Sequence, residues 1–145
     1  MQECQLQKDK FINLAVFFWY NKKFTWRHAT GGVTLYVNKF VLFSEIELDT
    51  DLQSIAVRMS AKKTLTVCNL YLPLSLDVNL SDLEHLIQQL PAPFVLVGDI
   101  NARSPLLGDV RQDSRGQMVE KLLNGYNLCY LNTSEPTYRH HNHHS

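Results

Sequence analysis

The feature that most constrains the fold is a pair of alternating runs joined by a short link. Residues 54–60 alternate between polar and apolar side chains, with Ile55, Val57 and Met59 on one face. Residues 65–72 follow after the link 61–64, and Pro73 ends the second run. Alternation at a period of two indicates strands, and two strands joined by a short link indicate a hairpin. Because proline cannot donate to a strand ladder, it closes the second strand. The sequence therefore predicts an antiparallel hairpin over residues 54–72.

Three other short runs also indicate strands. Residues 33–37 alternate after a predicted turn at Gly31-Gly32. Residues 94–97 form a continuous apolar run, which is typical of a strand covered on both faces. Residues 128–131 are the last candidate strand.

Two stretches carry apolar residues at helical spacing. In residues 80–90, Ser81 and Glu84 form a capping-box pattern, and Pro91 and Pro93 end the helix. A second helix is predicted from about residue 114 to 124, with Gly125 as its stop. Strands interspersed with helices predict an α+β or mixed α/β layered domain.

Length and composition narrow the class of protein. A chain of 145 residues, 45% of them apolar, predicts one globular domain or part of one. Its apolar runs are far shorter than the roughly 20 residues of a membrane span, and no secretory signal is visible. We therefore expect a soluble, intracellular chain without membrane contact. Fourteen basic and fourteen acidic residues cancel, so the total charge shows no nucleic-acid-binding footprint.

The three cysteines do not form a metal or redox motif. Cys4, Cys68 and Cys129 are odd in number and widely spaced, which predicts reduced thiols. Cys68 and Cys129 lie in apolar segments, where a buried, inert cysteine is common.

The segment that carries the most chemical information is Gly98-Asp99-Ile100-Asn101, directly after the apolar run 94–97. In an extended backbone, residues two apart point to the same side, so Asp99 and Asn101 are expected to project together. The carboxylate can accept a proton from water, and the amide can hold a phosphate oxygen or the same water. Gly-Asp-x-Asn is also a common turn sequence, and on spacing alone the turn is favoured.

Further segments, taken in order along the chain, resemble one superfamily. They are Gln2-Glu3-Cys4, Gly31 to Val37, Asn69-Leu-Tyr71-Leu-Pro73, the Gly98 to Asn101 segment with its flanks, Asp113-Ser-Arg-Gly116, Leu128 to Asn132 and Pro136-Thr137-Tyr138. Together they resemble the endonuclease/exonuclease/phosphatase superfamily, in particular the endonuclease domain of jockey-type non-LTR retrotransposons, which accompanies a reverse transcriptase. The resemblance implies a partial four-layer α/β/β/α fold.

The resemblance also implies roles for individual residues. Glu3 would bind the divalent metal, Mg²⁺ or Mn²⁺, and Tyr71 would be the active-site tyrosine. Asp99 would orient or deprotonate the attacking water, while Asn101 would contact the phosphate or that water, and Arg103 would bind substrate. The implied reaction is metal-assisted hydrolysis of a DNA phosphodiester, since Mg²⁺ needs only one or two carboxylates beside substrate oxygens and waters. A retrotransposon role implies nuclear localisation.

The sequence also departs from the family pattern. The family's first Asn-bearing strand and its C-terminal Ser-x-Asp and Asp-His segments have no counterpart, and Arg103 and Leu107 replace a His and a Trp. We therefore expect an incomplete domain over residues 1–138, a His-rich disordered tail over 139–145, and impaired catalysis. The alternative is a non-catalytic relic or fragment that binds nucleic acid or protein through exposed sheet edges. A phosphatase-type member of the superfamily is a further alternative.

Several residues have a plain structural interpretation beside a functional one. Tyr71 is equally well explained as a core tyrosine, and Glu3 as a terminal residue that is not tied down. The aromatic cluster 17–20 could stack bases or form the core of a strand, and the strand core is expected. Lys22-Lys23 and Arg27-His28 could contact phosphate or lie in a polar loop, and the loop is expected. The tail histidines could chelate a metal but are expected to be solvated, and His85 is expected at the surface; the tail residues are His140, His141, His143 and His144.

Overall fold

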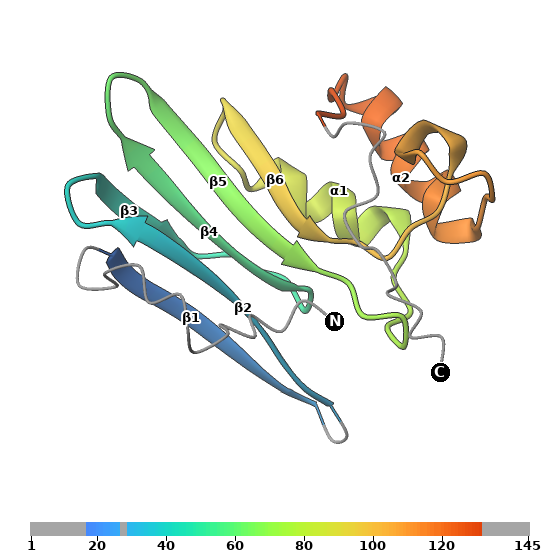
Figure 1. Ribbon diagram of the computed structural model, residues 1–145, viewed down its shortest axis with the longest axis horizontal. Coiled ribbons are helices and arrows are strands. Elements are labelled where there is room, and N and C mark those ends of the chain that lie inside the picture. The colour runs from blue at the N-terminus through green and yellow to red at the C-terminus, as the bar shows by residue number, and fades with distance from the viewer. Residues whose placement is uncertain (1–16, 27–28, 132–145) are drawn as a thin grey trace, which may run out of the picture. The chain divides into compact units, whose positions relative to one another are not determined.

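The computed structural model describes residues 17–26 and 29–131, which fall into two compact units divided between Ile100 and Asn101. Within these described residues, the first unit contains six strands and one helix, and the second contains a short 3-10 helix and one α-helix. The elements, in chain order, are β1 (Phe17–Trp26), β2 (Ala29–Asn38), β3 (Leu42–Ile46), β4 (Gln53–Ser60), β5 (Thr64–Tyr71), α1 (Leu80–Gln88), β6 (Phe94–Asp99), η2 (Pro105–Leu107) and α2 (Ser114–Gly125) (Figure 1).

The first unit is organised around a mixed four-stranded sheet of order β3-β4-β5-β6. β4 pairs with β5 in antiparallel register, which confirms the predicted hairpin. β3, a short strand that the sequence pattern did not predict, pairs with β4 on the other side. β6 pairs with β5 in parallel, and α1 provides the crossover that a parallel pair requires. This combination of a mixed sheet with helices agrees with the expected α+β class.

The two faces of the sheet are covered by different elements. On one face, the Nδ2 atom of Asn69 donates a hydrogen bond of 3.1 Å to the carbonyl of Thr34 in β2. β1 and β2 form a separate antiparallel pair, in which Gly31 and Gly32 belong to the strand and not to the predicted turn. On the other face, Thr66 donates to the carbonyl of Pro91, just after α1. The unit is therefore layered as α1, the four-stranded sheet and the β1–β2 pair (Figure 1).

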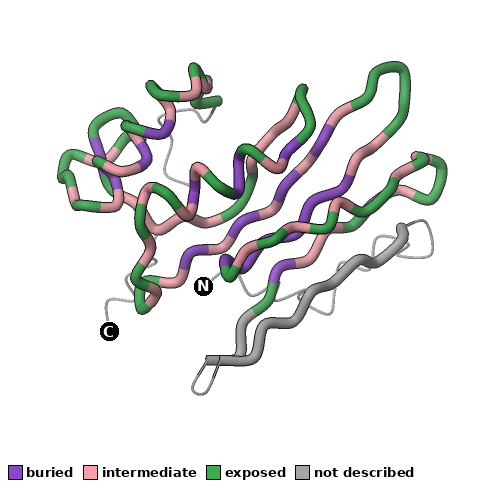
Figure 2. Tube along the Cα trace, turned by 180° about the vertical axis from the view of Figure 1, so that it is seen from behind, coloured by how far each residue is buried: buried purple, intermediate pink, exposed green. Residues whose placement is uncertain are grey.

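The core lies along β4, β5 and α1, where Figure 2 shows the buried positions. β4 is buried on both faces, because Ile55 and Val57 face one side and Ala56 the other. The sequence pattern indicated one apolar face for this strand, whereas the structure buries both faces. Met59, which belongs to the predicted apolar face, is half-exposed. The apolar side of α1 contributes Leu83, Leu86 and Ile87.

The start of α1 differs in detail from the sequence prediction. The capping box is formed by Asn79 and Asp82, two positions before the predicted pair Ser81 and Glu84. The Asn79 side chain accepts a bond of 3.0 Å from the Asp82 amide, and the Asp82 carboxylate accepts one of 3.1 Å from the Asn79 amide. Both pairs have the three-residue spacing of the capping box. Asparagine is at least as good an N-cap residue as serine, and because Asn79 precedes Ser81 the helix begins directly after Asn79.

The predicted covering of β6 on both faces is wrong. Phe94, Val95 and Leu96 are half-buried, and Val97 is 43% exposed. β6 is an edge strand among the described residues, since β5 is its one partner in the sheet. A continuous apolar run is therefore compatible with an edge position, which periodicity cannot distinguish from a central one.

In the second unit, α2 begins where the sequence predicts and extends through Gly125, with Tyr126 as its C-cap. No strand is assigned to residues 128–131, so the last strand candidate is not confirmed there. Across the described residues, no helix is long and apolar enough to cross a membrane.

Candidate functional site

Tyr71 and Asp99 are brought together by strand register. The parallel pairing of β5 and β6 places Tyr71 opposite Asp99, and the antiparallel pairing of β4 and β5 places Gln53 opposite Tyr71. Residues paired across neighbouring strands carry their side chains on the same face. Gln53, Tyr71 and Asp99 therefore form a row across three strands, on the face that meets β2, and we call it the site row.

The site row lies where β5 and β6 end, and the backbone holds this end closely. The amide of Leu72 donates a hydrogen bond of 2.9 Å to the carbonyl of Asp99, so the ladder continues one residue past β5. Because neighbouring strands are about 4.8 Å apart, the phenol and the carboxylate start from adjacent backbone positions. Both residues are half-buried, which leaves part of each accessible to a ligand.

Gly98 explains why a glycine precedes the aspartate. Its φ is +130°, a conformation that residues with a β-carbon rarely adopt. A β-carbon at this position would lie 1.9 Å from the carbonyl oxygen of Leu70 and 2.8 Å from Oδ1 of Asn69. The glycine therefore permits the close approach of β6 to β5 that sets the position of Asp99.

The strand argument for Asn101 does not hold in the structure. β6 ends at Asp99, and Asn101 has a φ of +47°, in the left-handed region. The alternation of an extended chain therefore does not extend to Asn101, which is the first residue of the second unit. Asparagine is among the residues that adopt this conformation most readily. The role of Asn101 stays a prediction.

Arg103 belongs to a loop closed by Asp113. Oδ1 of Asp113 accepts hydrogen bonds from the amides of Arg103, at 3.1 Å, and Gly116, at 2.6 Å. The amide of Asp113 in turn donates to the carbonyl of Arg103 at 3.0 Å. The hydrogen bond from the Gly116 amide is the main cause that lowers the pKa of Asp113. A β-carbon on Gly116 would lie 1.9 Å from the Arg103 carbonyl oxygen, so the Asp-x-x-Gly segment needs both of its defining residues.

The Arg103 side chain lies on the surface of this loop. Its Nε atom is 3.8 Å from a carboxylate oxygen of Asp109, and its side chain is 53% exposed. Asp109 also lies 3.5 Å from Nε of Arg111, and the backbone amide of Arg111 is the main cause that lowers the pKa of Asp109. Such exposed ion pairs contribute little to stability.

Several predicted residues lie outside the described part of the chain. These are Glu3, Cys4, residues 27–28 and the four histidines of the tail. The segments 17–20 and 22–23 lie in β1, which agrees with a strand for the aromatic cluster, and Lys22-Lys23 therefore belongs to this strand and not to a loop. His85 is exposed, as expected.

The two described cysteines differ from each other. Cys68 is buried in β5, and burial raises the pKa of its thiol to about 12. Cys129 is exposed, so the predicted burial is wrong for that residue. Its apolar neighbours in sequence belong to an irregular segment and not to a buried strand. The Cys68 thiol therefore lacks the lowered pKa of a nucleophile.

The described residues hold no cluster of three or more histidine, cysteine or acidic side chains that could bind a metal. A tight all-protein cage is therefore absent from this part of the chain. The site row offers one carboxylate, that of Asp99, and Mg²⁺ is usually bound by one or two carboxylates while it keeps several waters. The Asp99 carboxylate therefore fits a hydrated ion.

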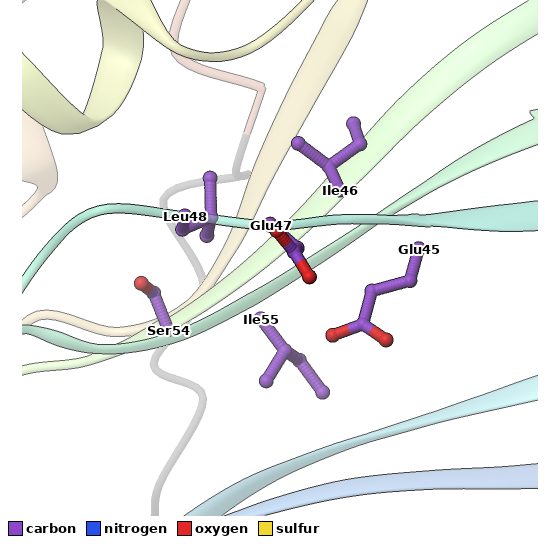
Figure 3. Close-up of a pocket in the computed structure, with 6 residues that line it drawn as sticks. All are labelled: Glu45, Ile46, Glu47, Leu48, Ser54 and Ile55. Atoms are coloured by element: carbon purple, nitrogen blue, oxygen red, sulfur yellow. The ribbon is translucent and has the colours of Figure 1, made fainter.

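A separate cavity of about 250 Å³ opens beside β3 and β4. It is lined by Glu45, Ile46, Glu47, Leu48, Ser54 and Ile55, and Figure 3 shows the two carboxylates beside Ile55. Neither Tyr71 nor Asp99 lines this cavity. The sequence prediction missed it because β3 itself was not predicted.

Gln53 is the member of the site row that the sequence prediction missed. The observed register, which begins at Ser60 opposite Thr64, pairs Gln53 with Tyr71, whereas counting outward from the predicted link 61–64 would have paired Gln53 with Leu72. The hydrophobic pattern drew attention to residues 54–60 instead, and a polar residue at a strand end gives no periodic signal.

The mixed sheet and the two α-helices of the described residues are those of an α+β protein. Residues 65–145, more than half of the chain, match the model of the endonuclease-reverse transcriptase family. The chain therefore belongs to this family, which lies within the endonuclease/exonuclease/phosphatase superfamily. The matched residues include Tyr71, Asp99, Asn101 and Arg103. No curated protein and no solved structure matches the chain.

Proposed function

We propose that this domain hydrolyses DNA phosphodiesters as a Mg²⁺-dependent endonuclease of retrotransposon origin, and that it acts in the nucleus. Family membership supports an endonuclease-type hydrolase. The observation that carries the proposal is the register that sets Tyr71 beside Asp99 at the ends of β5 and β6. A carboxylate and a phenol on adjacent backbone positions provide two oxygen acceptors for one water molecule.

Each residue has a distinct role in the proposed reaction. The Asp99 carboxylate orients the attacking water and takes its proton, and the Tyr71 oxygen holds the second hydrogen of that water. The amide of Asn101 contacts a phosphate oxygen, and the Arg103 guanidinium binds the negatively charged substrate. The groups of Asp99 and Tyr71 position the water, and by family resemblance those of Asn101 and Arg103 bind the phosphate.

Mg²⁺, or Mn²⁺ in its place, supplies a positive charge that stabilises the developing charge on the phosphate when it is bound. By family resemblance, Glu3 holds the ion. The Asp99 carboxylate would suit a divalent ion chemically.

The proposal is tested by nicking of supercoiled plasmid DNA with Mg²⁺. We expect the unaltered chain to nick slowly, as an impaired endonuclease, and Asp99→Asn to lower the rate about 100-fold or more, because it removes the proton acceptor while keeping the shape. Asp51→Asn is the matched control, since Asp51 is an exposed aspartate in the loop before β4. Equal nicking by the Asp99→Asn and Asp51→Asn proteins would contradict the proposed role of Asp99.

A second candidate function is supported by the edge of the sheet. Among the described strands β6 is an edge strand with Val97 43% exposed, and an apolar edge favours pairing with another chain. In this alternative the domain binds protein or nucleic acid without catalysis. Self-association that disappears in Val97→Lys, together with no nicking, would favour it over the endonuclease.

A further inference from the structure

Gln53 carries an unusual polar group for a core position. Its side chain is 5% exposed, and its Oε1 atom is buried without a hydrogen-bond partner among the described residues. Most buried polar atoms in proteins are paired, because an unpaired acceptor has lost water and gained nothing in return. An apolar side chain would suit this position better for folding alone, so the amide calls for a functional explanation.

The position of Gln53 supplies that explanation. It is directly opposite Tyr71, and Tyr71 is directly opposite Asp99. Cβ atoms of directly opposed residues are about 4.5–5.5 Å apart, so the side chains of Gln53 and Tyr71 start from adjacent positions on one face of the sheet. The amide oxygen accepts hydrogen bonds only, and the phenol has one hydrogen to donate.

We propose that Gln53 is a positioning residue for Tyr71, an inference that rests on the proposed endonuclease function. When substrate binds, the Oε1 atom of Gln53 accepts the phenolic hydrogen of Tyr71. The phenol is then oriented, and its oxygen lone pairs are free to accept a hydrogen from the attacking water beside Asp99. In the free protein the Oε1 atom of Gln53 has no hydrogen-bond partner among the described residues, and its burial lowers the stability of the folded state.

A structural role for Gln53 makes the opposite prediction. A glutamine that holds the core together would destabilise the protein when removed, as a broken hydrogen bond does. If Gln53 is instead an acceptor for Tyr71 when substrate binds, its unpaired oxygen destabilises the free protein. Removal of that oxygen then stabilises the fold and lowers activity. The sign of the stability change therefore distinguishes the two roles.

The first measurement is urea unfolding of the full chain without DNA. Gln53→Met keeps the length of the side chain and removes the acceptor, and we expect the ratio of folded to unfolded protein to rise about fivefold or more. Ser54→Ala is the matched control, because Ser54 is equally buried in β4 but lies on the opposite face from the site row. A loss of stability in Gln53→Met would overturn the proposal.

The second measurement is plasmid nicking by the same variants. We expect Gln53→Met and Tyr71→Phe each to lower kcat about tenfold with little change in KM, since the bond positions a group and does not bind DNA. The double variant should be no slower than Tyr71→Phe alone, because both changes remove one hydrogen bond. Gln53→Glu keeps an oxygen acceptor and should retain more activity than Gln53→Met.

The outcomes separate the inference from the function on which it rests. Full activity in Gln53→Met, or multiplicative losses in the double variant, would overturn the role of Gln53 while the endonuclease proposal stands. Absence of nicking by the unaltered chain with either Mg²⁺ or Mn²⁺ would refute the endonuclease proposal itself, and the positioning role with it.

Discussion

The site row and the loop from Arg103 to Asp113 hold their proposed functional residues in different ways. In the first unit, the ladder of β4, β5 and β6 sets the positions of Tyr71 and Asp99, so backbone pairing fixes the geometry. In the second unit, one carboxylate, that of Asp113, joins the Arg103 amide to the start of α2. Geometry set by a sheet depends on close backbone approach, whereas geometry set by a side chain depends on one residue and its charge.

The comparison predicts the largest effect at Gly98. Gly98→Ala places a β-carbon 1.9 Å from the Leu70 carbonyl oxygen at a φ of +130°, and both β5 and β6 must shift to relieve the clash. We expect a loss of about 3 kcal/mol or more in the free energy of unfolding, measured with urea.

Gly125→Ala is the control for this change. Nothing lies within 4 Å of the position of its β-carbon, and Gly125 is the last residue of α2. We expect a neutral effect or a gain of a few tenths of a kcal/mol, because alanine favours a helix over glycine. If the two alanine variants were equally stable, strand approach would not be what positions Asp99.

The difference between the two regions also explains what the sequence alone could predict. The hairpin, α1 and α2 each carry a periodic pattern longer than seven residues, and all three are confirmed. β3 was missed because its five residues are mostly exposed and show no alternation. A local pattern therefore finds an element when the element has one consistently buried side.

The site required information that no local pattern contains. The pairing of β5 with β6 joins residues 28 positions apart, as in Tyr71 with Asp99, and parallel pairing leaves no turn signal in the sequence. The chemistry of Asp99 was predicted from its residue type, but the position of Gln53 opposite Tyr71 depends on register. The left-handed backbone of Asn101 was likewise not visible in a strand pattern.

A smaller effect is expected at Asp113, which tests the side-chain part of the comparison. Asp113→Ala removes the cap of α2 and leaves the Arg103 and Gly116 amides without their acceptor. We expect a loss of about 1–2 kcal/mol in the free energy of unfolding of the second unit, measured by hydrogen exchange of the α2 amides. Asp113→Asn keeps a good cap and should lose less.

The same residue gives a pH dependence with a definite sign. Hydrogen bonds hold the pKa of Asp113 below its ordinary value, so its contribution is complete above the unfolded pKa of about 3.9. The contribution is lost as pH falls from there through the folded pKa. The stability difference between the unaltered chain and Asp113→Asn should therefore be constant from pH 7 to 5 and shrink below about pH 4. A constant difference down to pH 2 would show that the charge of Asp113 contributes nothing.

The last comparison between the two units concerns the rate at which a thiol reagent modifies their cysteines. In a Cys4→Ser chain, a thiol reagent at pH 8 should modify exposed Cys129 at once and leave Cys68 intact. A pKa of about 12 leaves roughly one Cys68 thiol in ten thousand ionised at that pH, and burial in β5 excludes the reagent as well.

Cys68 then reacts only when the sheet opens, so its rate of modification reports the stability of the first unit. Gly98→Ala should accelerate that rate, whereas Asp113→Ala should leave it unchanged because Asp113 stabilises the other unit. Equal acceleration by both variants would mean that the two units unfold together, and the contrast between sheet-held and side-chain-held geometry would then not extend to stability.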